Sequence, residues 1–194
     1  MISARQQPFP RAGLLLAGLG IALALRLTVA GIEGAQSALA GLVFATALLL
    51  VVLAAGWRPG QLRPGAIAVG VLGAAGLVAV PTWLRLTGAT VPAQLPLDAL
   101  LSWAMVVSAV AVTEELLLRG ILFTDLESAW GAPAAVGVTA AAFGLLHVPL
   151  YGWEALPLDL AVGVWLGGLR IISRTVAAPA VAHTLADLAA WWLA

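Results

Sequence analysis

The sequence predicts an all-α protein, a polytopic membrane bundle of about seven transmembrane helices. Hydrophobic residues make up 62% of the 194 residues, charged residues only 9%, and the mean hydropathy is +1.06. Soluble domains carry about a quarter charged residues. Apolar runs of roughly 20 residues, the length that spans the hydrocarbon core as a helix, recur between clusters of Gly, Pro and charged residues. These observations indicate an integral membrane protein.

Dividing the chain at the Gly, Pro and charge clusters separates the candidate spans. In order, they cover residues 12–31, 37–55, 65–84, 97–126, 132–150, 156–172 and 176–194. The first span follows Arg5 and Arg11 like a signal peptide, but no convincing cleavage site follows, so we interpret it as a retained helix in which Arg26 extends to an interface. Because the connections are short, residues 1–194 are expected to form one membrane-embedded domain.

The arginines between the spans predict the orientation. If the spans alternate, Arg85 lies in a loop on one side, and the other side carries Arg5, Arg11, Arg58, Arg63, Arg170 and Arg174. We therefore expect a cytoplasmic amino terminus. All basic residues are Arg, and Ala, Gly and Leu are abundant, which suggests a bacterial genome of high GC content and hence the inner, cytoplasmic membrane.

Composition also excludes several functions. The 9 basic residues are balanced by 9 acidic ones, so no positive field favours nucleic acid as a partner. Cysteine is absent, which excludes disulfides, thiolate metal ligands and cysteine nucleophiles. The expected surroundings are the lipid bilayer, and no sequence feature specifies an oligomeric state.

Ionisable residues interrupt three of the predicted spans, which is costly in hydrocarbon unless they pair, and therefore marks a functional site. The three motifs are Glu114-Glu115-Leu-Leu-Leu-Arg119, Phe143-Gly-Leu-Leu-His147 and His183-Thr-Leu-Ala-Asp187. Residues four apart share a helix face, so Glu115 is expected to neutralise Arg119. Glu114 is turned by about 100° and is then free to face a cavity. Acidic residues at predicted helix ends, such as Asp159, are interpreted as solvated.

Depth along the helices decides whether the motifs can meet. If the fourth span ended at Arg119, Glu114 would lie near the cytoplasmic surface, whereas His147 would lie roughly 21 Å along its own span. If the helix continues to Leu126, Glu114 lies roughly 18 Å from the cytoplasmic turn, in one layer with both histidines. We therefore predict a fourth helix of about 30 residues, which must tilt, break or protrude.

A cluster of Glu, two His and Asp supports hydrolysis. Glu114 can act as a general base, and His147 can help to orient and deprotonate water. His183 and Asp187 are placed to organise hydrogen bonds at the oxyanion, provided that Asp187 accepts from His183. Two other hypotheses remain open: a haem or metal carrier with histidine ligands, and a proton-coupled transporter or catalytically silent immunity protein.

The ordered trio of motifs resembles the CAAX-prenyl-protease and bacteriocin-processing (CPBP, or Abi) family of intramembrane glutamic proteases. The resemblance covers residues 114–187, within a protease region at about 97–194. It implies a CPBP-type intramembrane endopeptidase whose cavity opens toward the cytoplasm. The implied catalytic residues are Glu114, His147, His183 and Asp187, and the implied supporting residues are Glu115, Arg119 and Phe143.

The resemblance also bears on cofactor and substrate. Glu114, His147 and His183 could hold zinc, but a metal-free mechanism is favoured. Eukaryotic relatives trim prenylated carboxyl-terminal tripeptides, and bacterial relatives include bacteriocin-maturation and immunity proteins and small enzymes thought to process carboxyl-terminal membrane anchors. We expect a hydrophobic protein or peptide substrate, membrane-associated or lipid-anchored, such as a carboxyl-terminal sorting anchor.

Overall fold

The computed structural model describes residues 8–60, 63–86 and 99–193, and within these ranges it contains helices and turns but no strand. The elements are α1 (Pro8–Ala30), α2 (Ala38–Ala54), α3 (Pro64–Leu86), α4 (Leu100–Glu115), the π-helix η2 (Leu116–Leu122), α5 (Phe123–Trp130), α6 (Ala132–Tyr151), the 3-10 helix η3 (Trp153–Ala155), α7 (Leu156–Ser173) and α8 (Ala177–Leu193). The all-α prediction is confirmed. Some predictions concern residues outside the described ranges: the orientation signal at Arg5, and the span positions 97–98 and Ala194.

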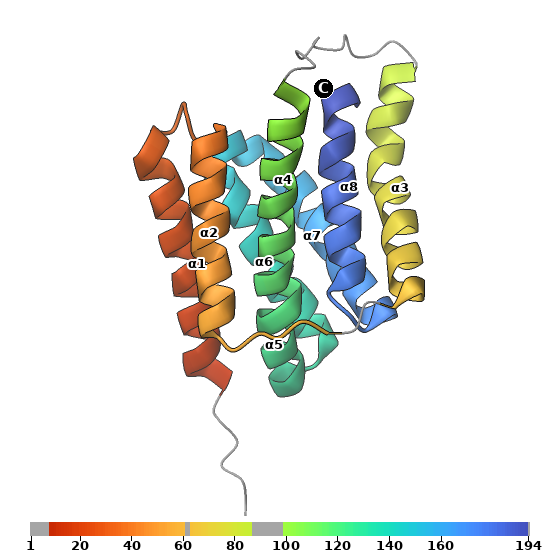
Figure 1. Ribbon diagram of the computed structural model, residues 1–194. Helices are drawn as coiled ribbons and strands as arrows, with labels where there is room; N and C mark the ends of the chain where they lie inside the picture. The colour runs from red at the N-terminus through yellow and green to blue at the C-terminus, as the bar shows by residue number, and fades with distance from the viewer. Residues whose placement is uncertain (1–7, 61–62, 87–98, 194) are drawn as a thin grey trace, which may run out of the picture.

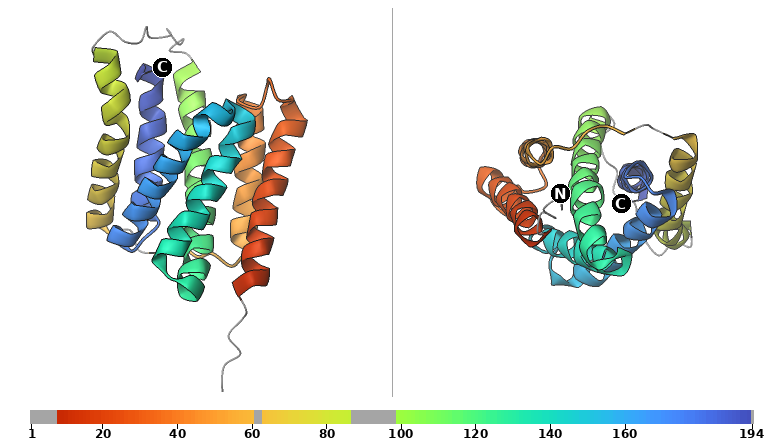
Figure 2. Two further views of the ribbon diagram at one scale, coloured as in Figure 1. Left: turned by 180° about the vertical axis from the view of Figure 1, so that it is seen from behind. Right: turned by 90° about the horizontal axis from the view of Figure 1, so that it is seen from below.

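The continuous helix formed by α4, η2 and α5 runs through the middle of the bundle (Figure 2, right). On one side of it α1 packs against α2, and on the other α3 packs against α8 (Figure 1). Behind it in Figure 1, α6 and α7 pack on each other, and both contact η2. Segments far apart in the sequence therefore meet around η2.

Three described helices are long and apolar enough to cross a membrane: Pro10–Ala30, Ala132–Tyr151 and Trp153–Ser173. Two shorter apolar helices cover Ala38–Ala54 and Pro64–Ala79. Each predicted span coincides with helix in the described residues, but the number of crossings stays a prediction.

The fourth predicted span is continuous helix beyond Arg119, as the depth comparison required. The sequence did not predict that Leu116–Leu122 would be π-helical. Such segments are rare and often occur at functional sites. The segment is held from outside, because Arg170 Nε on α7 donates to the Arg119 carbonyl at 3.0 Å.

Two arginines have surroundings that the sequence did not predict. Arg26 is buried, donates to the Ala35 carbonyl in the α1–α2 turn at 2.7 Å and lies over the Phe44 ring. Its place at a membrane interface stays a prediction. The guanidinium finds a hydrogen-bond acceptor in the following turn, which satisfies it without exposure. Arg85, expected in a loop, belongs to the last turn of α3.

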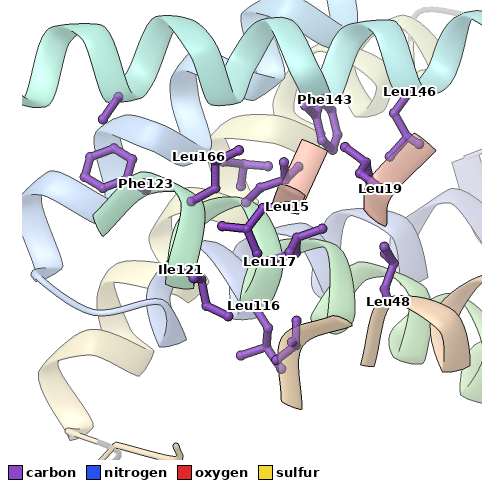
Figure 3. Packing of buried hydrophobic residues seen from close by; sticks show 14 of the residues in the cluster. Leu15, Leu19, Leu48, Leu116, Leu117, Ile121, Phe123, Phe143, Leu146 and Leu166 are labelled. Atoms are coloured by element: carbon purple, nitrogen blue, oxygen red, sulfur yellow. The ribbon is translucent and has the colours of Figure 1, made fainter. Parts of the chain in front are cut away.

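Buried apolar side chains enclose η2. Figure 3 shows them converging from η2 itself, α1, α2, α6 and α7, with Leu116, Leu117, Ile121, Leu15, Leu19, Leu48, Phe143, Leu146 and Leu166 among those labelled. Dense packing of this kind, rather than a hydrophobic drive, associates helices in a bilayer. The ionisable residues of the central helix therefore sit inside a closely packed shell.

Small residues allow α6 and α7 to approach closely. A Cβ added to Gly163 would lie 2.8 Å from the Ala140 Cα, and one added to Gly167 would lie 3.1 Å from Val136. Both glycines are therefore packing positions. The backbone approach at Gly163 matters for the site, since its carbonyl faces the central helix.

We predict that Gly163→Ala destabilises the protein by about 1–3 kcal/mol, because the new methyl group meets backbone that cannot move aside easily. Gly168→Ala on the same helix is the matched control, since a Cβ there meets nothing within 4 Å. Helix propensity alone should make that control neutral or up to about 1 kcal/mol more stable. Thermal unfolding in detergent measures both, and equal shifts in the two variants would contradict the prediction.

Candidate active site

An ion pair between Arg119 and Glu115 lies at the centre of the site. Arg119 Nη1 donates to Glu115 Oε1 at 2.7 Å, and both side chains are fully buried. Arg119 Nη2 donates to the Gly163 carbonyl at 3.0 Å, and the guanidinium lies 5.0 Å from the centre of the Phe143 ring. The predicted pairing is thus present. The same arginine also connects η2 to α7 through the Gly163 carbonyl and to α6 through the Phe143 ring.

His183 of α8 bridges two carboxylates. Its Nδ1 lies 3.1 Å from Glu115 Oε1, and its Nε2 lies 3.5 Å from Asp187 Oδ2. The approach to Asp187 was expected from their spacing along the helix. The contact with Glu115 was not, because it depends on how α8 packs against the central helix. One carboxylate oxygen of Glu115 therefore accepts from both Arg119 and His183.

His147 is oriented by its own helix. Its Nδ1 lies 2.8 Å from the Phe143 carbonyl, which can only accept, so Nδ1 carries the proton and Nε2 is the nitrogen left for other partners. The ring packs against Phe143 at 4.4 Å and stacks on Tyr151 at 5.7 Å. Phe143 also contacts the His183 ring edge-on, at 5.3 Å. The aromatic residue that the sequence ranked as supporting thus separates and positions both imidazoles.

Glu114 is buried but unpaired. In the described part of the chain no hydrogen bond or ion pair involves its carboxylate, although it lies within electrostatic range of both histidines and of Asp187. The structure therefore brings all four predicted residues into one cluster, with Glu115 bound by Arg119 and Glu114 available.

Asp159 is more enclosed than its place in the sequence predicted. This residue was interpreted as solvated at the start of a helix, yet its Oδ2 is buried without a hydrogen-bond partner in the described ranges. Asp159 lies one turn before Gly163, whose carbonyl binds Arg119, but that contact joins separate helices and gave no signal in the sequence. Tyr151, by contrast, lies one turn after His147 on the same helix, and this spacing could have indicated that the two rings stack.

The exposed fraction of the side chains increases along α6 and α8 toward the carboxyl end of each helix. On α6, Phe143 is 2% exposed and Tyr151 is 53% exposed. On α8, the side chain of His183 is 7% exposed and that of Asp187 is 32% exposed. The exposure of the cluster's side chains therefore increases from Arg119 toward the α6–α7 turn.

The residues that could hold zinc do not form a ready ligand set. Among the described residues, no three His, Asp or Glu side chains are grouped so as to bind one ion, and this includes Glu114, His147 and His183.

The fold and the site together define a helical membrane protein with a buried cluster of carboxylates and imidazoles. Residues 96–189, which include every residue of the cluster, match the family model described as type II CAAX prenyl endopeptidase Rce1-like. This match supports membership of the CAAX protease (CPBP) family, as the resemblance indicated. Comparison with curated proteins and with solved structures gave no match.

We predict that Arg119→Met destabilises the protein by about 3–5 kcal/mol, because it leaves the Glu115 carboxylate buried without its cation. The double variant Glu115→Gln with Arg119→Met removes both charges and should recover a large part of that loss. Unfolding of the two variants and of Glu115→Gln in detergent gives the coupling energy. Strictly additive effects would show that the ion pair does not hold the site together.

Proposed function

We propose that this protein is an intramembrane endopeptidase that hydrolyses a peptide bond of a membrane-associated or lipid-anchored protein. The observation that carries the proposal is the unpaired, buried carboxylate of Glu114 beside two imidazoles. Membership of a family of prenyl endopeptidases supports protease activity. It does not favour a haem carrier, a transporter or a silent immunity protein.

Glu114 and His147 activate the attacking water. The Glu114 carboxylate removes a proton from water, and His147 orients that water through Nε2, since Nδ1 is held by the Phe143 carbonyl. The water oxygen attacks the carbonyl carbon of the peptide bond, and the C=O π electrons move to oxygen. When the intermediate collapses, the C–N bond breaks and Glu114 returns the proton to the leaving amine.

His183 stabilises the oxyanion, and Asp187 positions the imidazole of His183. A carboxylate repels a developing negative charge, so Asp187 cannot itself be the donor. In its doubly protonated form, His183 donates Nδ1–H to Glu115 and directs Nε2–H toward Asp187 or the oxyanion. Arg119 completes the support by fixing Glu115. Each member of the predicted set then has a separate role.

We predict that Glu114→Gln lowers proteolysis at least about 100-fold, because an amide cannot take the proton from water. Glu33→Gln, the same change at an exposed position, is the matched control and should keep full activity. The measurement compares the termini of membrane proteins in cells that express each variant. Equal cleavage in both strains, with both proteins inserted, would disprove the role of Glu114.

We propose a metal-free reaction, because two carboxylates and two imidazoles already supply a base, a proton carrier and an oxyanion donor. Cleavage by the purified protein should therefore persist after dialysis against EDTA. Loss of activity with EDTA, restored by zinc and not by magnesium, would instead assign Glu114, His147 and His183 as metal ligands.

A further inference from the structure

The start of α1, the α2–α3 connection and α5 lie at one end of the bundle (Figure 1). Together with η2 they enclose a hollow of about 280 Å³, here called the Arg11 hollow. Arg11 lines it from α1, Trp57 from the α2–α3 connection, and Gly120, Thr124 and Asp125 from the central helix. None of these residues belongs to the cluster around Glu114, so the hollow is a second candidate site.

Arg11 connects the walls of the Arg11 hollow. Its Nη2 donates to the Ala55 carbonyl at 3.0 Å, and its Nε lies 3.1 Å from Asp125 Oδ2. On the central helix, Gly120 leaves room for the indole, since a Cβ added there would lie 3.7 Å from Trp57 Nε1. One side chain thus holds three segments in place, and a preorganised site of this kind binds a ligand at a smaller entropic cost.

Two donors in the Arg11 hollow have no acceptor among the described residues. They are Nη1 of Arg11, whose printed partners engage Nε and Nη2 only, and Nε1 of Trp57. A guanidinium offers five N–H groups, and an indole offers one. Of the described residues that line the hollow, Asp125 alone is acidic, and Arg11 neutralises it. The hollow therefore suits a ligand that accepts hydrogen bonds.

Positive charge dominates this end of the bundle. In the described ranges it carries two carboxylates, those of Asp125 and Glu127, and five arginines, namely Arg11, Arg58, Arg63, Arg170 and Arg174. Arg58 directly follows Trp57, and Arg170 Nη2 donates to Thr124 Oγ1 at 3.4 Å, beside the hollow. This excess of positive charge attracts an anion and disfavours a ligand that carries a cation.

The depth of the Arg11 hollow along the helices indicates the source of the anion. Arg11 lies at the start of the apolar segment Pro10–Ala30, and Ala55 directly follows the apolar helix Ala38–Ala54. The ends of membrane-crossing helices lie at the level of the lipid headgroups, where tryptophan is enriched. Basic pockets between helices at this level bind anionic headgroups. The chemistry and the depth thus agree on a lipid phosphate.

We propose that the Arg11 hollow binds the phosphate group of an anionic phospholipid of the surrounding bilayer. Arg11 Nη1 and Trp57 Nε1 donate to the phosphate oxygens, and the acyl chains stay in the bilayer. Because Gly120 directly follows Arg119, the bound headgroup contacts the π-helical segment that carries the buried ion pair. The proposal does not rest on the proposed function.

Thermal unfolding of the purified protein in neutral detergent measures binding, since a ligand of the folded state raises the unfolding temperature. The probes are dioctanoyl phosphatidylglycerol, dioctanoyl phosphatidylcholine, whose phosphate is joined to a cation, and inorganic phosphate. We expect phosphatidylglycerol to bind at least about 5-fold more tightly than phosphatidylcholine. At equal concentration, inorganic phosphate should leave the unfolding temperature unchanged. Equal binding of the two lipids, or equal stabilisation by inorganic phosphate, would overturn the proposal.

Two variants assign the binding to the Arg11 hollow. Arg11→Gln and Trp57→Phe each remove a donor to a charged group and should weaken the binding of phosphatidylglycerol about 10-fold. Arg174→Gln is the matched control, because it removes a positive charge from the same end without touching the hollow, and it should weaken binding about 2-fold or less.

Trp57→Phe decides the question by itself if Arg11→Gln fails to fold, because it keeps the aromatic ring and the contacts of Arg11. Unchanged binding in the Trp57→Phe variant would show that the headgroup does not lie in the hollow. A loss in the Arg174→Gln variant as large as the loss in Trp57→Phe would show general attraction to a basic surface, and it would also overturn the proposal.

Discussion

The buried guanidinium of Arg119 is the constraint on which the rest of the site depends. A cation removed from water needs compensating partners, and here they come from three directions: Glu115 on the same helix, the Gly163 carbonyl on α7 and the Phe143 ring on α6. Glu115 in turn accepts from His183 on α8. Satisfying one charge therefore fixes four helical elements relative to one another, and Glu114 is left without a competing partner.

The π-helical segment is part of the same arrangement. Arg119 lies within it, and its carbonyl accepts from Arg170 on α7 while its side chain reaches Gly163 on that same helix. The close approach of α7 that both contacts need is possible because Gly163 has no side chain to hold the helices apart. The unusual helix, the glycine and the buried arginine thus depend on one another.

Much of this arrangement follows from spacing within single helices. The pairs Glu115 with Arg119 and His183 with Asp187 could be predicted because residues four apart share a face. Comparing depths also showed that the fourth helix must continue past Arg119. Asp159 and the contact between Glu115 and His183 could not be predicted in this way. Both depend on which faces of separate helices meet, and packing decides that.

By itself, the sequence determined the helical class, the resemblance of its motifs to those of the CAAX proteases, and which side chains of one helix can meet, because hydropathy and helical periodicity are local properties. The tertiary structure alone decided that Glu115 serves two partners and that one oxygen of the Asp159 carboxylate is buried. These features depend on close packing between helices, where a glycine or a buried charge determines how near two backbones come.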